Sequence, residues 1–564
     1  MVVEASLQRD VHGFKDEEAG VTTKIDNGVV GSYVKGVTLP EVNFSAFFGD
    51  VFARHKDETA LVDARTGAQY TFGELHDASL RVAAGLRRLG LRTGDIVCFH
   101  ATNGADLVVA MCGTFFAGGT AAMAKTNLTE REIHYQFQDS RPKFVVTDLC
   151  EAGRAVKAYE RITSVEAVIV TTGSYEGTLS LSQLVKTPLD NTDSPADGGP
   201  DTVMAIIYSS GSTGLPKGVQ LTHRNIIAQV LSYGYLDASI FQKGDIFLCS
   251  ASLMHVGGFS LTMCYLGHGC QVVLVHTPDY SIIMPAIEKY KATSLLLYPT
   301  FAQRLSVYPL LSQSDTRSLT KVIIAGNTVN SMILQNVTRK LRLRGVIQAY
   351  GMTELAGIVT FSIPRLDDFK SVGKPSAFVE MKVVDTQSQK NLGALEKGEI
   401  FVKSPGAFKG YLGRPEEMAR IFQDGFIRTG DTGFYAPDGR FFVCGRLKEL
   451  IKCMDQQVAP AEIEELLAAD TSVRHVVVAG VPHPEYGEAA RAFVVLDRLP
   501  ADGKEESETA ARLRALVANQ LSFHKHLHGG VEFLESIPQT DSGKELRSAL
   551  QQSYMQKLKR IQAH

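Results

Sequence analysis

Apolar residues along this chain follow two spacings in turn, and this pattern predicts strands that alternate with helices. Residues 43–55 and 74–89 carry apolar side chains three or four positions apart, which is the spacing of one helix face. Short unbroken apolar runs between such helices predict buried strands. Before residue 200 the predicted strands are 60–63, 68–70, 95–100, 143–147 and 167–170, with a further helix at 130–139. After residue 200 the predicted helices are 223–235, 257–266, 281–290 and 331–343, and the predicted strands are 203–207, 246–250, 271–275, 294–298, 322–325 and 346–349. Thr222 is a predicted cap of the first of these helices. Such alternation is typical of mainly parallel sheets joined by helical crossovers.

The pattern changes at Asp385, and the change predicts where the domains divide. Short strands with glycine-bearing turns continue to about Val443 and predict a small β-rich subdomain. From Gly445 onward, strands and helices mix again in a stretch long enough for a complete α+β domain. The predicted fold is therefore α/β: a large N-terminal domain of mainly parallel αβα sheets with the β-rich subdomain, followed by a small α+β C-terminal domain. The predicted units are a polar extension at 1–38, a large domain at 39–444 that includes the subdomain at about 385–444, and a small domain at 445–564.

One apolar run raises the question of a membrane. Leu107 to Ala124 is uncharged and reaches the lower limit of a membrane span. Glycines and threonines interrupt the run, and charged residues bound it on both sides. A buried helix that leads into a buried strand is the preferred interpretation, and no membrane span is expected.

Composition narrows the class of protein further. The 564 residues carry a net charge of −3 and a pI near 6.6, which disfavours a protein that binds nucleic acid through a basic surface. Eight cysteines without any C-x-x-C pair indicate a reduced intracellular protein without structural zinc. The polar N-terminus has no apolar core of a signal peptide, and the end Gln562-Ala563-His564 is not an S-K-L-type peroxisomal address. Cytoplasm is the default expectation, with the peroxisome as the alternative, and nothing points to an obligatory protein partner.

The most informative stretch runs from Tyr208 to Gly218, after a predicted strand. It offers four hydroxyls and one ammonium in a glycine-rich loop, a set of donors that suits a polyphosphate. The residues concerned are Ser209, Ser210, Gly211, Ser212, Thr213, Gly214 and Lys217. Pro216 stands where a Walker A loop needs glycine, so the loop is not of that type. The alternative interpretation is a flexible polar surface loop.

Four further clusters could act on the same ligand. Tyr350, Gly351, Thr353 and Glu354 follow a predicted strand, where open parallel sheets bind ligands. Tyr350 offers a flat face for a base, and Glu354 offers a hard oxygen ligand for Mg²⁺. The other clusters are Thr429-Gly430-Asp431, Gly445-Arg446-Leu447-Lys448-Glu449 and Thr540-Asp541-Ser542-Gly543-Lys544. In isolation, Asp431 reads as a residue that stabilises its own turn.

These five clusters, in this order, resemble the motifs of the adenylate-forming superfamily, which includes acyl-CoA synthetases, 4-coumarate–CoA ligases and beetle luciferases. The similarity extends from Phe44 through Leu546. It implies that Tyr350 lies on adenine, that Asp431 and Arg446 lie near the ribose, and that Glu354 faces magnesium. It also implies that Lys544 is the catalytic lysine, carried by a mobile small domain that turns about a hinge at Arg446. His255 is implied to lie in the acyl pocket beside the acyl carboxylate, although a lone histidine near an apolar helix is more often a packed core residue.

The reaction implied by the resemblance activates a small carboxylic acid with ATP and Mg²⁺ and then transfers the acyl group to coenzyme A. Two departures from the family pattern bear on it. Met454 and Asp455 stand where coumarate and luciferase relatives have Lys and Gly, and a carboxylate there would disfavour an incoming thiolate. In the acyl pocket the run Gly326-Asn327-Thr328 brings polar side chains where relatives carry small apolar groups, which predicts a smaller or more polar acid than coumarate.

Two alternatives to a CoA ligase stay open at the level of sequence. One is a luciferase-like enzyme, or another adenylating enzyme whose acceptor is not coenzyme A, because luciferases share all five motifs. The other is a catalytically silent nucleotide-binding protein. The presence of Lys544 argues against the second alternative, because a silent protein has no need of that residue.

Overall fold

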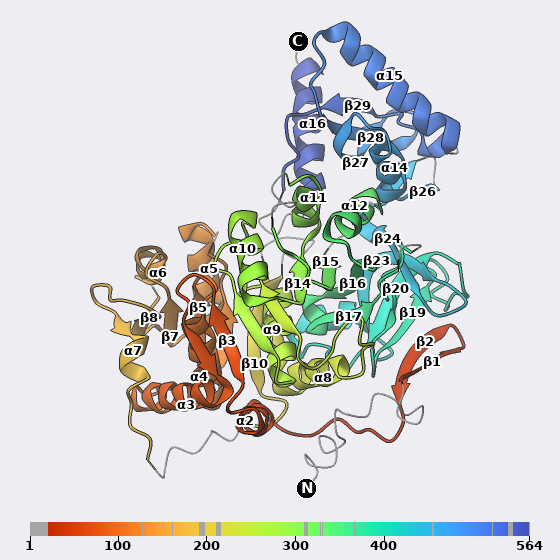
Figure 1. Cartoon of the computed structure of the whole chain (residues 1–564). Coiled ribbons are helices and arrows are strands. Elements are labelled where there is room, and N and C mark those ends of the chain that lie inside the picture. Colours follow the sequence, from red (N-terminus) through yellow and green to blue (C-terminus); the bar gives the residue numbers. More distant parts are fainter. Residues whose placement is uncertain are drawn as a thin grey trace.

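The computed structural model describes residues 21–126, 128–160, 162–190, 198–209, 216–308, 314–326, 329, 331–365, 368–453, 456–521, 523–539 and 545–562. The chain folds into a large body that carries three sheets and a smaller C-terminal unit that carries a fourth (Figure 1). This arrangement confirms the predicted α/β class with its large N-terminal and small C-terminal domains.

The first sheet is mainly parallel and positions the glycine-rich loop. Its order is β21 (Gly410–Tyr411), β11 (Lys217–Thr222), β10 (Val203–Ser209), β6 (Thr120–Met123), β5 (Ile96–His100), β7 (Phe144–Thr147), β8 (Ala167–Val170) and β9 (Leu179–Ser180). The strands from β10 to β9 pair in parallel, whereas β11 and β21 are antiparallel. Its strands contact α4 (Ala105–Phe116), α5 (Glu130–Ser140), α6 (Ala152–Tyr159), α7 (Leu181–Leu184) and α8 (His223–Tyr233).

The second sheet has a parallel centre and antiparallel strands at its edges. Its order is β18 (Lys374–Pro375), β17 (Gly357–Phe361), β16 (Ile347–Met352), β15 (Lys321–Ala325), β14 (Ser294–Leu297), β12 (Ile246–Cys249), β13 (Gln271–Leu274), β3 (Thr59–Asp63) and β4 (Gln69–Thr71). Its strands contact α3 (Phe72–Arg88), α9 (Val256–Gly267), α10 (Tyr280–Tyr290) and α11 (Pro299–Val307). Helix α2 (Phe44–Arg54) packs on α3 and α4, and α12 (Ser331–Leu341) packs on α11. Because α4 contacts both β6 and β3, it joins the two sheets in one large apolar core.

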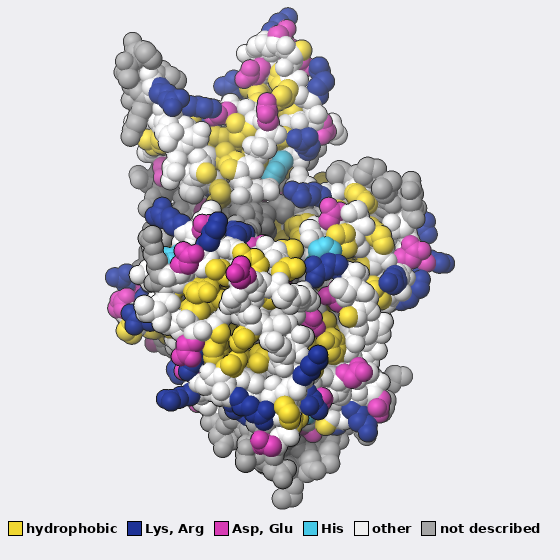
Figure 2. Space-filling view, turned by 90° about the vertical axis from the view of Figure 1, so that its left-hand side faces the viewer, with side chains coloured by type: hydrophobic (Ala, Val, Ile, Leu, Met, Phe, Trp, Pro, Cys, Tyr) yellow, Lys and Arg dark blue, Asp and Glu magenta, His cyan; other side chains and the backbone are white. Residues whose placement is uncertain are grey.

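The apolar run at 107–124 is confirmed as core. It forms most of α4 and all of β6, and every residue of α4 except Asp106 is buried. No helix of the described ranges combines the length and the apolar character that crossing a bilayer requires. On the face drawn in Figure 2, acidic and basic side chains are interspersed over the described surface, in line with the small net charge.

The third sheet is antiparallel and corrects the prediction for the N-terminus. It contains β1 (Val21–Asp26), β2 (Val29–Val34), β19 (Glu380–Val384), β20 (Gly398–Lys403), β22 (Phe422–Gln423), β23 (Phe426–Tyr435) and β24 (Phe441–Arg446). The predicted extension at 1–38 is therefore wrong for 21–34, which adds a hairpin to this sheet by pairing β2 with β19. Asn27 and Gly28 both have positive φ, 49° and 77°, as the tight turn of a two-residue hairpin requires.

The small domain follows η4 (Leu447–Glu449) and is built on the fourth sheet. The strands are β25 (Ile451–Cys453), β26 (Gln456–Val458), β27 (Val473–His483), β28 (Gly487–Leu496) and β29 (Gly530–Phe533), with helices α14 (Pro460–Ala468), α15 (Gly503–Gln520) and α16 (Arg547–Gln562). It lies above α11 and α12 of the body (Figure 1). Lys370 pairs with Glu465 at 2.9 Å, and Gln303 donates to the Arg474 carbonyl at 3.0 Å. Such contacts between exposed polar groups contribute little to the stability of the interface.

A buried ion pair ties three strands of the second sheet together. Lys321 Nζ lies 2.7 and 2.5 Å from the two carboxylate oxygens of Asp245, and Thr293 donates to the same carboxylate at 2.9 Å. The Lys321 side chain is 4% exposed and that of Asp245 is 0% exposed. Removing one partner therefore leaves a charge buried without its counter-ion.

Replacing Lys321 with Met should lower the free energy of unfolding by about 3–5 kcal/mol, the usual cost of breaking a buried pair from one side. The double variant Lys321→Met/Asp245→Leu should recover part of that loss, because it removes both charges. Denaturant unfolding of the two variants measures the difference. If both variants lose the same free energy of unfolding, the Asp245 carboxylate is not left as an unpaired buried charge when Lys321 is replaced.

Candidate active site

The glycine-rich loop connects two antiparallel strands. Ser209 ends β10 and Lys217 begins β11, and the two residues are register partners. Sequence analysis placed a helix soon after the loop, and β11 precedes that helix. Thr222 then caps α8 as predicted, by accepting a hydrogen bond from the Asn225 backbone N–H. Ser210, Gly211, Ser212, Thr213 and Gly214 lie outside the described residues, so the structure fixes both ends of the loop.

Glu354 lies directly beside the end of this loop. Its Oε1 accepts hydrogen bonds from the Ser209 hydroxyl at 3.2 Å and from the Tyr411 hydroxyl at 2.8 Å. Glu354 is 7% exposed, and it belongs to the 3₁₀ turn η2 (Thr353–Leu355) that follows β16. Burial and then the charge of Glu354 raise the pKa of Tyr411. A carboxylate is therefore held rigidly at the mouth of the predicted phosphate cradle.

Lys217 faces the same point from β11. Its ammonium lies 2.8 Å from Glu417 Oε1 and 5.3 Å from the centre of the Tyr411 ring. The hydrogen bond from Lys217 lowers the pKa of Glu417. Lys217 was predicted as part of the loop, whereas neither Glu417 nor Tyr411 was predicted as a site residue.

A second group forms around Asp431. The Tyr350 hydroxyl donates to Asp431 Oδ2 at 2.7 Å, and Arg446 Nε lies 2.8 Å from Oδ1. Asp431 and Arg446 are register partners on β23 and β24, which accounts for their meeting. Although burial opposes the charged form, the Asp431 carboxylate holds the pKa of Arg446 above its usual value. Burial, then the Asp431 charge, raises the pKa of Tyr350.

Two backbone positions in this group differ from their prediction. Tyr350 and Gly351 lie within β16 rather than after a strand, because β17 pairs antiparallel with β16 and extends it to Met352. A Cβ on Gly351 would lie 2.0 Å from the Gly357 carbonyl oxygen, so this position requires glycine. Asp431 lies in β23 beside a bulge at Thr432 rather than in a bend.

His255 lies in a different part of the body, beside a cavity of about 250 Å³ at the carboxyl ends of strands from the first two sheets. The cavity is lined by Thr102, Asn103, Lys125, Thr126, Ser250, Ala251, Ser252, His255, His276, Pro278, Leu296, Tyr298 and Phe301. Tyr298 connects His255 to the predicted acyl pocket, because its hydroxyl lies 2.8 Å from His255 Nδ1 and its ring lies beside Gly326. Asn327 and Thr328 of that pocket lie outside the described residues. Sequence analysis missed Tyr298 and Lys125.

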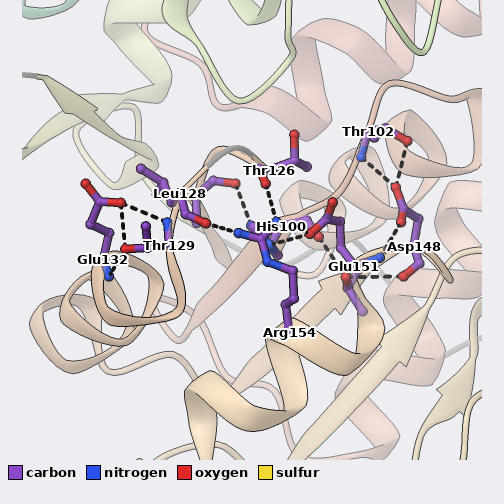
Figure 3. Close-up of polar contacts among 11 residues, drawn as sticks. His100, Thr102, Thr126, Leu128, Thr129, Glu132, Asp148, Glu151 and Arg154 are labelled. Carbon is purple, nitrogen blue, oxygen red and sulfur yellow. Dashed lines mark hydrogen bonds and ion pairs between the residues drawn. The ribbon is translucent and has the colours of Figure 1, made fainter. Parts of the chain in front are cut away.

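The wall of the cavity at Thr102 and Thr126 is held by a polar network (Figure 3). Asp148 accepts hydrogen bonds from the Thr102 backbone N–H and hydroxyl, both at 2.7 Å. Arg154 donates to the Thr126 carbonyl at 2.7 Å and to the Leu128 carbonyl, and it pairs with Glu151 at 2.8 Å. The bonds from Arg154 fix the chain just after Lys125, which also lines the cavity.

The predicted catalytic lysine comes from the far end of the small domain. Lys544 and its neighbours from Thr540 lie outside the described residues. Gln539 and Glu545 on either side form an antiparallel bridge. Arg547, 11% exposed, pairs with Glu464 at 2.8 Å and with Glu449 at 3.0 Å, and so anchors the segment after this bridge. The lysine therefore belongs to a segment whose two ends are tied together. Met454 and Asp455 also lie outside the described residues.

Comparison with known proteins is consistent across both domains. Residues 48–412 match the family model described as AMP-binding enzyme, and residues 462–544 match that of the AMP-binding enzyme C-terminal domain. The chain is 31% identical over 523 residues to 4-coumarate–CoA ligase 3 of Oryza sativa subsp. japonica, covering 91% of this chain and 92% of the relative. It is 30% identical over 498 residues to luciferin 4-monooxygenase of Photinus pyralis, covering 86% of this chain and 89% of the relative. Among solved structures, ATP-bound MatB from Rhodopseudomonas palustris superposes with a TM-score of 0.81 at 27% identity, covering 91% of this chain and 99% of that one.

Proposed function

This chain belongs to the AMP-binding, adenylate-forming enzyme family, and we propose that it activates a carboxylic acid with ATP and passes the acyl group to coenzyme A. The observation that carries the proposal is that Tyr350, Asp431 and Arg446 meet at one point. At the glycine-rich loop, Ser209 donates to Glu354 at one end, and Lys217 pairs with Glu417 at the other. These two groups provide the two recognition elements that a nucleoside triphosphate needs, one for the nucleoside and one for the phosphates.

In the first step, a carboxylate oxygen of the acid attacks the α-phosphorus of ATP. The bond from that phosphorus to the bridging oxygen breaks, and pyrophosphate leaves. Both reactants are anionic, so the protein must align them and offset the charge that accumulates at phosphorus. Lys217 on β11 and Lys544 on the small domain supply ammonium groups for this purpose. Asp431 can accept hydrogen bonds from the ribose hydroxyls and so hold the nucleotide in register.

Glu354 has the properties expected of a magnesium ligand. Its carboxylate is buried, hydrogen-bonded by two hydroxyls and placed where the phosphate loop begins. Hard oxygen ligands of this kind suit Mg²⁺, which usually keeps several waters and binds substrate phosphates as well. When bound there, the ion would neutralise phosphate charge. The hydroxyls of Ser209 and Tyr411 orient the carboxylate for that contact.

The second step transfers the acyl group. The sulfur of the coenzyme A thiolate attacks the acyl carbon, and AMP leaves. The small domain would turn about the segment after Arg446 between the steps, a gate of the kind that many enzymes use. Weak polar contacts between the domains are compatible with such a turn.

One feature of the chain favours a second candidate function, an adenylating enzyme with another acceptor. Asp455 replaces a glycine that coumarate and luciferase relatives carry, and its charge would repel a thiolate. Luciferin 4-monooxygenase of Photinus pyralis, 30% identical to this chain, makes a luciferase-like oxygenase one member of this class. A catalytically silent nucleotide-binding protein is the remaining alternative.

Acid-dependent exchange between ATP and labelled pyrophosphate tests the first step. The enzyme is incubated with ATP, Mg²⁺ and a panel of carboxylic acids from acetate to coumarate, with no acid as the control. Exchange with at least one small acid is expected. ATP binding without exchange for any acid would favour the silent alternative.

Replacing Asp455 with Gly should increase the rate of thioester formation with coenzyme A and leave the exchange rate unchanged, because adenylation does not use that position. Thioester formation is measured by chromatographic separation of the products, with an acid that supports exchange in the assay above. An unchanged thioester rate would mean that the carboxylate does not obstruct the thiol. If both the unaltered enzyme and the variant catalyse ATP–pyrophosphate exchange but form no thioester, the result would support an acceptor other than coenzyme A.

A further inference from the structure

We propose that Tyr298 is a positioning residue that holds His255 in the tautomer with hydrogen on Nε2, so that His255 presents a donor, and not a base, to the cavity. This inference concerns one side chain of the site and depends on the proposed function only for its catalytic consequence. The tautomer itself is a property of the folded protein.

The start of helix α9 decides which nitrogen of His255 carries the hydrogen. His255 is the N-cap of this helix, and its Nδ1 accepts a hydrogen bond from the Gly257 backbone N–H at 3.2 Å. A backbone N–H can only donate, so Nδ1 must hold a lone pair. A neutral imidazole has one donor and one acceptor nitrogen, and the hydrogen therefore lies on Nε2.

The Tyr298 hydroxyl provides a second donor to the same nitrogen. It lies 2.8 Å from Nδ1, and its ring stands edge-on to the imidazole with centroids 5.4 Å apart and planes at 83°. Since Nδ1 is already an acceptor, the tyrosine O–H donates to it. Two donors on one nitrogen favour this tautomer more than the helix start alone would.

The chain makes room for this contact at two glycines. A Cβ on Gly257 would lie 2.9 Å from the Tyr298 hydroxyl oxygen, and a Cβ on Gly326 would lie 3.1 Å from Tyr298 Cδ1. Tyr298 itself is the N-cap of α11, at the end of β14. Its position is thus set by strand, helix and two close backbone approaches, as a positioning role requires.

The charges around His255 act in the same direction. Burial lowers the pKa of His255 to about 3, and the ammonium of Lys125 contributes to that shift. The positive end of the α9 dipole also disfavours an imidazolium. The other titratable groups nearby are Tyr298, whose pKa burial raises, His276 of the cavity wall, and Cys249 beside Tyr298. His255 therefore stays neutral across the physiological pH range.

The consequence concerns both steps of the reaction. With Nδ1 taken by Gly257 and Tyr298, the Nε2–H edge is the one left for the cavity, where it can donate to a carboxylate or acyl oxygen. A nitrogen that already carries its hydrogen cannot remove the proton of an incoming thiol. The acceptor must therefore lose its proton to another group or to solvent.

Nitrogen NMR of protein labelled with ¹⁵N-histidine tests the tautomer without substrate. The His255 signals are assigned by their loss in His255→Gln. We expect Nδ1 at the shift of an unprotonated acceptor and Nε2 at that of a protonated nitrogen, both unchanged from pH 8 to pH 5. Hydrogen on Nδ1, or a titration in that interval, would overturn the inference whatever the result of the exchange assay.

The role of Tyr298 is tested by Tyr298→Phe, with Tyr265→Phe as the matched control. Tyr265 is fully buried, whereas Tyr298 is partly buried, and each variant gives up one hydroxyl contact, which for Tyr265 is a bond of 2.7 Å to Ser294. Tyr298→Phe should shift the Nδ1 resonance and lower kcat/KM for exchange by about three- to tenfold. The control should change neither. Identical Nδ1 shifts in the two variants would show that Tyr298 does not position His255.

Discussion

Replacing Lys544 with Ala should reduce acid-dependent ATP–pyrophosphate exchange by about 100- to 1,000-fold, the usual effect of removing one group that stabilises transition-state charge. ATP affinity should stay nearly the same, because the proposed nucleotide site lies on the body at Tyr350, Asp431 and Arg446. Exchange kinetics and equilibrium ATP binding, measured on the same preparation, separate the two effects.

The chain offers a matched control for this variant. Lys504 lies in the same domain, is 83% exposed and contacts only Glu508 at 3.9 Å among its ion-pair partners in the described chain. Lys504→Ala should leave both exchange and binding unchanged. If Lys544→Ala lost exchange and ATP affinity to the same extent, the lysine would serve binding, and the proposed role in the reaction would be wrong.

Replacing Asp431 with Asn should weaken ATP binding by about 10- to 100-fold, the effect of losing hydrogen bonds to a charged group. The substitution removes the carboxylate that pairs with Arg446 and accepts the Tyr350 hydroxyl. It also removes the charged acceptor for the ribose hydroxyls. Binding of ATP by calorimetry, with and without acid, measures the change.

Asp438 provides the control for Asp431. It also pairs with an arginine, Arg440, at 2.6 Å, but its side chain is 49% exposed and lies in a turn away from the site. Asp438→Asn should leave ATP affinity unchanged. A thermal melt of both variants separates lost binding from lost folding. Unchanged ATP affinity in folded Asp431→Asn would remove Asp431 from the nucleotide site.

Elements with strong local signals could be predicted from the sequence. Strand β8 and the cap of α8 at Thr222 are correct because an unbroken apolar run and a capping residue act within a few positions. Hairpin β1–β2 was missed although its Asn27-Gly28 turn is a strong signal. The residues of β1 are mostly exposed, so the strand shows no apolar pattern, and the hairpin joins the sheet only because β2 pairs with the distant strand β19.

The residues of the candidate site also divide into those with a local sequence signal and those without one. Glu354, Asp431 and Arg446 were found because each lies in a short motif. Their partners could not be predicted by spacing, because contacts across sheets are not recorded in local sequence. Tyr411 is 57 positions from Glu354, and Tyr298 is 43 positions from His255. Only the pairing of β21 with β11 and the end of β14 bring these tyrosines to the site.

The central claim is that a carboxylate oxygen of the acid attacks the α-phosphorus of ATP, and the fate of that oxygen tests it most directly. The acid is labelled with ¹⁸O in both carboxylate oxygens and is turned over with ATP and the acceptor. Mass spectrometry of the products should find AMP that carries one ¹⁸O and pyrophosphate that carries none. Unlabelled AMP, or formation of ADP with label in inorganic phosphate, would contradict the account.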